Sequence, residues 1–162
     1  MSEKFVVGIS DYKVVKNEGI LVTYALGSCV GICIYDSRSK VGGLSHIMLP
    51  DSSMFSKNEV NRMKFADTAI VDMVRKLKLF GVDECRLTAK IAGGAQMFQV
   101  QAGSAIGSIG DRNVDSVKMV LGSLRIPIIA ENTKQNYGRT VFFDLTTGIM
   151  KVQTLNRSVL EL

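Results

Sequence analysis

The chain has 162 residues, of which 46% are hydrophobic and 22% charged, a composition typical of a globular protein with one well-filled core. It shows no apolar run of the roughly 20 residues that a membrane span needs and no signal-peptide pattern at the N-terminus. We therefore expect a single domain over residues 1–162, without membrane insertion, in the cytoplasm. The formal net charge of +5 is spread along the chain, which does not favour nucleic-acid binding.

The first half of the chain alternates short apolar runs with turn residues. The runs are rich in β-branched side chains and are bounded by Gly, Asn, Asp, Ser or Pro, which predicts strands. The expected strands cover residues 5–8, 20–26, 30–35 and 40–49. A turn around residues 36–39 would make the last two of them neighbours in one sheet.

A helical pattern follows a polar loop expected over residues 51–58. Apolar residues from Met63 to Leu77 recur at i, i+3 and i+4, and Gly81 is well placed to end this long helix. A second helix is expected to start near Asp111 and to end before Pro127.

The remaining apolar runs predict four further strands. They cover residues 85–92, 126–130, 139–144 and 149–153, and the last two are joined by a hairpin at residues 146–148. Together, these elements predict an α/β fold with a mixed sheet and two main helices.

The three cysteines and one histidine do not form the pattern of a disulfide or a metal site. Four residues of extended chain separate Cys29 from Cys33 by about 13 Å, which is too far for a disulfide. The chain has no CxxC, and His46 has no companion at a ligand spacing. We therefore expect neither a metal nor another cofactor.

Cys29 is the sharpest candidate for chemistry, because glycines flank it and a thiolate is a strong nucleophile. The bare backbone near Gly27 and Ser28 leaves amide N–H groups available to bind an oxyanion. The residues after Cys29 predict a strand, which disfavours the strand-to-helix nucleophile elbow of α/β-hydrolases. A small core residue is the alternative interpretation of Cys29, and it is the one we favour for Cys33 and Cys85.

His46 is the only histidine and therefore the only imidazole base. If the strands around it are neighbours, Cys29 and His46 lie near the same sheet end, where a thiolate–imidazolium pair can form. A hydrogen-bonded structural histidine is the alternative. Thr23 is available to orient the imidazole, although a threonine in a strand is by itself typical of β-structure. Gly93 and Gly94 lack a phosphate-binding pattern and predict a tight turn that shapes a cleft near Cys29.

Seven short motifs, in order along the chain, resemble the CheD family of chemoreceptor glutamine deamidases. They are Leu26-Gly-Ser-Cys-Val30, Ser45-His-Ile-Met-Leu-Pro50, Lys64-Phe-Ala-Asp67, Lys90-Ile-Ala-Gly-Gly-Ala-Gln-Met-Phe98, Ile109-Gly-Asp-Arg-Asn113, Gly138-Arg139 and Thr147-Gly148. Each motif is weak alone, but seven in sequence are specific.

The resemblance implies an α/β sandwich of mixed sheet flanked by helices. It implies catalysis by Cys29 as nucleophile, His46 as base and Thr23 as third member, without a cofactor. The implied reaction converts glutamines of methyl-accepting chemotaxis receptors to glutamate, and the implied partner is the CheC phosphatase. A non-catalytic regulatory binding module of the chemotaxis system is the alternative. Residues 132–137 depart from the family pattern, which we expect to affect recognition of receptor or partner.

Overall fold

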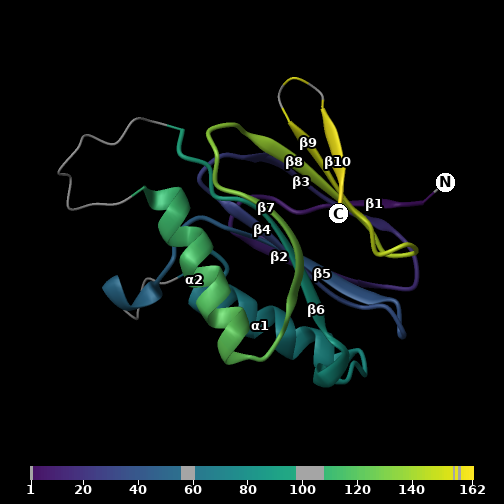
Figure 1. The fold of residues 1–162 in the computed structure, drawn as a ribbon. Coiled ribbons are helices and arrows are strands. Elements are labelled where there is room, and N and C mark those ends of the chain that lie inside the picture. The colour runs from purple at the N-terminus through teal and green to yellow at the C-terminus, as the bar shows by residue number, and fades with distance from the viewer. Residues whose placement is uncertain (1, 56–60, 98–107, 155, 157) are drawn as a thin grey trace.

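The computed structural model describes residues 2–55, 61–97, 108–154, 156 and 158–162. Within these residues, ten strands form two five-stranded sheets, and two α-helices cover one of the sheets (Figure 1). Both sheets contain parallel and antiparallel pairs, so the expected α/β sandwich of mixed sheets with flanking helices is confirmed. None of the helices in the described ranges is long and apolar enough to span a membrane.

Sheet A is the layer without helices, and it has the order β1-β3-β8-β9-β10. Its strands are β1 (Lys4–Val6), β3 (Ile20–Leu26), β8 (Arg139–Asp144), β9 (Met150–Thr154) and β10 (Val159–Glu161). The expected hairpin at residues 146–148 joins β8 to β9, where Gly148 has φ +73° and its N–H donates to the Asp144 carbonyl. The sequence pattern does not predict β10, because this strand is short and exposed on every residue.

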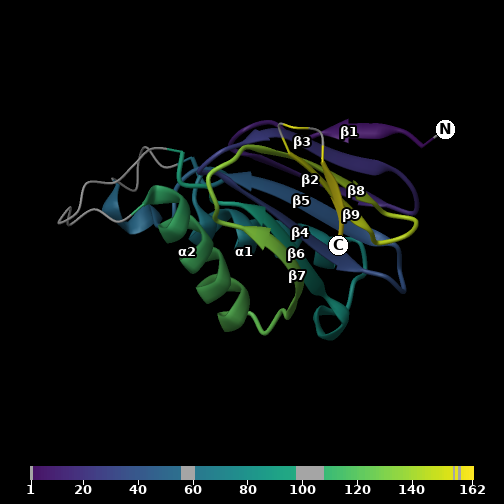
Figure 2. The same cartoon turned by 45° about the horizontal axis from the view of Figure 1, so that its top comes forward.

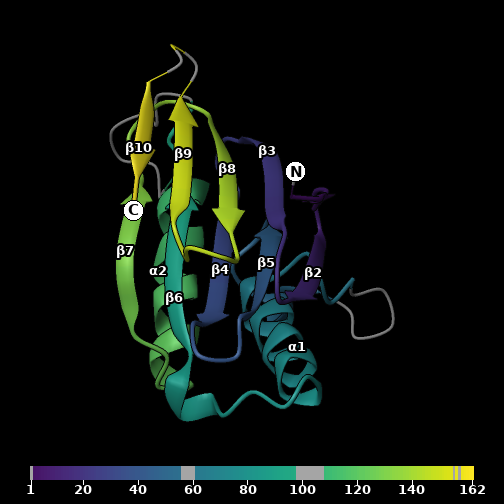
Figure 3. The same cartoon turned by 90° about the vertical axis from the view of Figure 1, so that its right-hand side faces the viewer.

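Sheet B is the central layer, and it has the order β2-β5-β4-β6-β7. Its strands are β2 (Asp11–Lys16), β5 (Val41–Ile47), β4 (Val30–Asp36), β6 (Thr88–Gly93) and β7 (Ile128–Thr133). Every residue of β4 and β5 is buried, because sheet A covers one face and the helices cover the other (Figure 3). The sequence pattern misses β2, an edge strand in which charged residues interrupt the apolar ones.

Two apolar cores lie on opposite faces of sheet B. On β4, Ile32 and Ile34 point into the core beneath the helices, whereas Cys33 and Tyr35 point into the core between the sheets. In Figure 2 the helices lie on one side of sheet B and sheet A on the other. Residues of odd number on β4 therefore face sheet A. Cys29, which immediately precedes β4, packs against the same core between the sheets.

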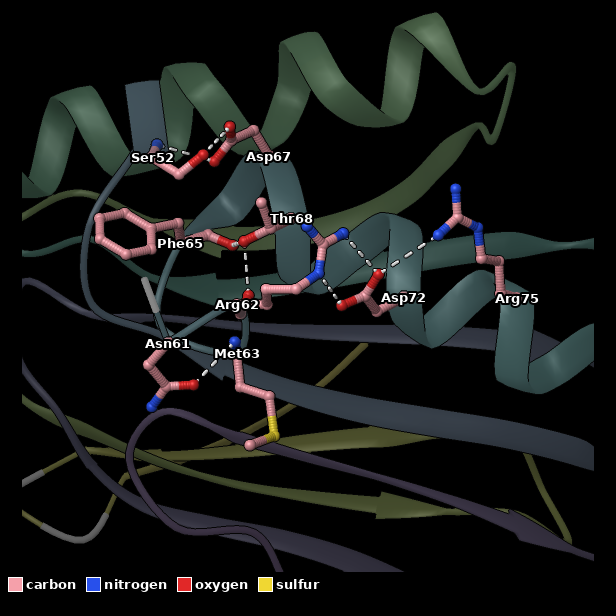
Figure 4. Close-up of polar contacts among 9 residues, drawn as sticks. All are labelled: Ser52, Asn61, Arg62, Met63, Phe65, Asp67, Thr68, Asp72 and Arg75. Atoms are coloured by element: carbon pink, nitrogen blue, oxygen red, sulfur yellow. Dashed lines mark hydrogen bonds and ion pairs between the residues drawn. The ribbon is translucent and has the colours of Figure 1, made fainter. Parts of the chain in front are cut away.

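The helix α1 (Ala66–Leu79) starts later than the apolar period predicts, so Met63 lies outside it. The reason is tertiary: the N–H groups of Met48 and Leu49 donate to the Lys64 carbonyl at 2.8 and 3.1 Å, which keeps that segment extended. Figure 4 shows how this segment is attached to α1 through a two-bond ion pair between Arg62 and Asp72. Gly81, with φ +83°, follows the helix as expected.

The second helix, α2 (Ile109–Ser123), begins two residues before the expected start and packs its apolar residues Val114, Val117 and Leu121 into the core beside α1. The strand expected from Cys85 starts only at Thr88, because Asp83 caps a short 3-10 turn, η2 (Glu84–Arg86). Cys85 is exposed there, so its interpretation as a core residue is wrong, whereas Cys33 is buried as predicted.

Two further expectations concern segments that the structure covers only in part. Within the expected loop at 51–58, residues Ser52–Met54 form a short 3-10 turn, η1, and residues 56–58 lie outside the described ranges. Phe98, the last residue of the Gly93–Gly94 motif, also lies outside them.

Candidate active site

The candidate site lies at one end of β4 and β5, on the face that meets sheet A. His46 on β5 is directly opposite Gly31 on β4, which confirms that these strands are antiparallel neighbours. Cys29 lies immediately before β4, which starts at Val30, and it packs against the core between the two sheets. The segment that carries Cys29 is therefore next to the end of β5 that carries His46.

Thr23, on β3 of sheet A, holds the imidazole from across the sandwich. Its Oγ1 lies 2.7 Å from His46 Nδ1 and donates to the Val7 carbonyl at 2.8 Å. Since a hydroxyl has only one proton and Val7 receives it, Nδ1 must be the donor to Thr23. This arrangement fixes the tautomer, with the proton on Nδ1 and a lone pair on Nε2. Both side chains are fully buried.

The Nε2 atom of His46 is buried and makes no hydrogen bond to any described residue. A buried imidazole nitrogen without a partner is costly for stability, which makes it a candidate position for chemistry or for a bound group. The Cys29 thiol is half-buried, so it is the more accessible member of the pair.

Gly31 leaves the space in which β3 approaches His46. A methyl group at this position would lie 3.2 Å from Leu26 Cδ1 and 3.6 Å from Thr23 Cγ2. A larger side chain would therefore occupy the gap between the two sheets and push Thr23 away from the imidazole. The sequence shows Gly31 only as a neighbour of Cys29, because its close contacts with Leu26 and Thr23 arise from the packing of the two sheets.

Burial holds both reactive groups in their neutral forms. It lowers the pKa of His46 to about 4. It also raises the pKa of the Cys29 thiol, an effect that a hydrogen bond from the residue's own N–H partly opposes. At neutral pH these directions favour a thiol beside a neutral imidazole over the thiolate–imidazolium pair that unperturbed pKa values allow.

The tight turn at Gly93 and Gly94 lies directly against the backbone of Cys29. Gly93 has φ +112°, and a methyl group there would lie 2.3 Å from the Cys29 carbonyl oxygen. The Gly94 N–H donates to that oxygen at 2.8 Å, and the Ala95 N–H donates to the Gly27 carbonyl at 2.9 Å. The turn therefore fixes the path of the cysteine loop, and the N–H of Gly94 is already occupied.

Two amide groups of the cysteine loop have no such partner. Neither the Ser28 N–H nor the Cys29 N–H donates to the backbone or side chain of another described residue. They are therefore candidate donors for an anionic oxygen next to the thiol. In the described ranges, no three His, Cys, Asp or Glu side chains gather as they would around a metal ion.

Comparison with known proteins gives the same family as the motifs. A sequence profile described as "CheD chemotactic sensory transduction" matches residues 48–154. A protein of Moorella thermoacetica named "Probable chemoreceptor glutamine deamidase CheD" is 50% identical over 152 residues, which cover 93% of this chain and 90% of that protein. The chain belongs to the CheD family. A protein of the same name from Caldanaerobacter subterraneus subsp. tengcongensis is 50% identical over 153 residues, covering 94% of each chain.

The match to the CheD profile begins after Thr23, Cys29 and His46, whereas the alignments with whole CheD relatives cover nearly all of this chain. A third relative, from Clostridium botulinum strain Alaska E43, is 47% identical over 156 residues, covering 96% of each chain. Family membership therefore rests on both halves of the molecule.

The Gly138-Arg139 motif of this CheD chain supports the glycine turn from the far side. Arg139 is buried, and it donates to Asn132 Oδ1 at 2.6 Å and to the Lys134 carbonyl at 2.9 Å. The Lys134 N–H in turn donates to the Gly93 carbonyl at 2.9 Å. Segment 132–137, which departs from the family pattern, is thus joined to the turn that holds Cys29, and its expected effect on recognition stays a prediction.

Proposed function

We propose that this protein is a chemoreceptor glutamine deamidase, which hydrolyses the side-chain carboxamide of glutamines on methyl-accepting chemotaxis receptors. The observation that carries the proposal is the hydrogen bond from His46 Nδ1 to Thr23, which leaves Nε2 without a partner among the described residues, while Cys29 packs against the core between the same two sheets. The names of the CheD relatives support the substrate class.

The first half of the reaction forms a thioester. His46 Nε2 takes the proton of the Cys29 thiol as the sulfur attacks the carboxamide carbon, so charge develops only during the attack. The carbonyl oxygen becomes an oxyanion that the N–H groups of Ser28 and Cys29 stabilise. The imidazolium then gives its proton to the amide nitrogen, the C–N bond breaks, and ammonia leaves.

The second half of the reaction restores the enzyme. A water molecule gives a proton to Nε2 as its oxygen attacks the thioester carbon. The C–S bond then breaks, the sulfur regains its proton from the imidazolium, and the receptor side chain leaves as glutamate. Thr23 accepts the Nδ1–H bond throughout, which keeps Nε2 directed at the reacting atoms. These steps need no cofactor.

The proposal also includes a place and a partner. The substrate glutamines lie on the cytoplasmic helices of receptors in the family that the motifs resemble, so we place this protein in the cytoplasm. Binding to the CheC phosphatase rests on the same resemblance, and a titration of the purified proteins would test it.

The direct test is incubation of the protein with cytoplasmic receptor fragments, followed by mass spectrometry for glutamine-to-glutamate conversion. We expect conversion by the wild type and by Cys85→Ala, which removes an exposed thiol far from the site in sequence. We expect Cys29→Ala and His46→Ala to abolish it. Conversion by Cys29→Ala would exclude the mechanism, and no conversion by the wild type, with receptor binding intact, would favour the regulatory binding module.

A further inference from the structure

Asn113 joins the two segments that carry the thiol and the imidazole. It lies on α2 and is fully buried, and its Nδ2 donates to the Ser28 carbonyl at 2.9 Å and to the Met48 carbonyl at 2.9 Å. Ser28 immediately precedes Cys29, and Met48 follows the end of β5, which carries His46. No other side chain of the described residues donates to both segments.

The two segments need a link at this point because their strand pairing ends there. Val30 and Ile47 are the last pair of the β4–β5 ladder. Beyond this pair, the Cys29 carbonyl accepts a hydrogen bond from the Gly94 N–H, whereas the N–H groups of Met48 and Leu49 donate to the Lys64 carbonyl. The glycine turn holds the cysteine loop on the β6 side, but no ladder bond ties that loop to the segment that follows His46.

The amide of Asn113 is used entirely as a donor. Both N–H groups reach carbonyl oxygens, whereas Oδ1 is buried and makes no hydrogen bond to a described residue. A position chosen only for packing would not need a buried amide, because an unpaired oxygen is costly and an apolar side chain of similar size avoids that cost. The two donated bonds are therefore the feature that distinguishes this residue.

We propose that Asn113 is a positioning residue that sets the distance between Cys29 and His46. Its described hydrogen bonds go to the backbone of Ser28 and Met48 and not to the thiol or the imidazole, so it acts through that backbone. The inference rests on the proposed function, since it assumes that Cys29 and His46 react together. Misplacement of reacting groups by about 1 Å can lower a rate about 100-fold, so a bridge of two hydrogen bonds is sufficient to control turnover.

Ser116 provides a matched control on the same helix. Its Oγ donates to the Pro50 carbonyl at 2.6 Å, so it also ties α2 to the chain that follows β5, but it does not reach the cysteine loop. Removal of this hydroxyl should cost stability without moving Cys29 relative to His46. Comparison of Asn113→Ala with Ser116→Ala therefore distinguishes a change in the position of Cys29 relative to His46 from a weaker attachment of α2.

The experiment measures the rate of Cys29 alkylation by iodoacetamide, resolved by peptide mass spectrometry, together with kcat and KM for deamidation. Cys85 is exposed and serves as the internal reference in every sample. We expect Asn113→Ala to lower kcat and the neutral-pH alkylation rate of Cys29 by about 10- to 100-fold, toward the values of His46→Ala. We expect Asn113→Ser, which retains one donor, to be intermediate, and Ser116→Ala to stay within about twofold of the wild type.

The possible outcomes distinguish a wrong role for Asn113 from a wrong function for the protein. If Asn113→Ala and Asn113→Ser fold, but keep the wild-type kcat, alkylation rate and pH dependence of alkylation, Asn113 is only structural and the inference is overturned. If the wild type does not deamidate receptor glutamines, the proposed function itself is wrong, and if Cys29→Ala still deamidates them, the assignment of Cys29 as nucleophile is wrong. A KM effect with an unchanged kcat would likewise contradict positioning of the reacting pair.

Discussion

The Thr23 hydroxyl has two hydrogen-bond partners, since it donates to the Val7 carbonyl and accepts from His46 Nδ1. Valine has nearly the same shape as threonine but can do neither. Thr23→Val would therefore leave a buried carbonyl and a buried N–H without partners, at a cost of about 1–3 kcal/mol each. The imidazole would also lose the contact that fixes its tautomer.

We expect Thr23→Val to lower kcat by at least about 10-fold, and Thr23→Ser to retain most of the activity because it keeps the hydroxyl. Because the chain has one histidine, nitrogen NMR can report the tautomer without ambiguity. The Nδ1–H form should dominate in the wild type and in Thr23→Ser. A spectrum of the Nε2–H form in the wild type would contradict the assigned roles.

At the scale of elements, the start of α2 is fitted against the turn that holds Cys29. A methyl group at Gly110 would lie 2.4 Å from the Ala95 carbonyl oxygen and 2.6 Å from that of Gly94. Gly122, near the other end of the same helix, has no atom within 4 Å of that position. Close packing therefore requires a glycine at position 110, whereas the packing leaves room for a side chain at position 122.

We expect Gly110→Ala to reduce the free energy of unfolding by about 1–3 kcal/mol, because the helix must move away from the turn. Activity should fall as well, since this turn binds the carbonyls of Gly27 and Cys29. Gly122→Ala should raise stability by about 0.5–1 kcal/mol, because alanine is the better helix former. Urea unfolding of both variants is the measurement, and equal effects would contradict the packing argument.

The elements that the sequence predicts are those whose pattern is set by local chemistry. The hairpin at residues 146–148 follows from its turn residues, and the apolar face of α1 follows from the helical spacing of its apolar residues. Met63 and Cys85 do not fit. Pairing of Phe65 with Leu49 keeps the chain before α1 extended, and capping by Asp83 forms a 3-10 turn where the pattern predicts a strand. In the site, Cys29 and His46 could be found from residue type, whereas the role of Asn113 depends on a helix that joins two distant segments.

At the scale of the whole molecule, the buried imidazole couples folding to pH. The pKa of His46 is about 4 in the folded protein, against about 6.5 in an unfolded chain. The unfolded chain therefore binds a proton more readily, and stability is fully present above pH 6.5. It falls as the pH drops toward 4, by as much as about 3 kcal/mol from this group.

We expect the urea midpoint of the wild type to fall more steeply between pH 6.5 and pH 4 than that of His46→Gln, which lacks the titrating group. Carboxylates titrate in both proteins, so the difference between the two curves isolates the imidazole. The NMR titration of the single histidine should have its midpoint near 4. Parallel stability curves, or a midpoint near the unperturbed value, would contradict the burial argument.

Thr23 and His46 lie in different sheets, and this separation affects the order in which the protein acquires its chemistry. Thr23, Cys29 and His46 all emerge early during synthesis, but β3, which carries Thr23, is paired in sheet A with β8 at residues 139–144. A ribosome-bound chain that lacks β8 holds the thiol and the imidazole without the strand partner that docks Thr23. We therefore expect the hydrogen bond between Thr23 and His46 to form only after residues 139–144 have been made and have paired with β3.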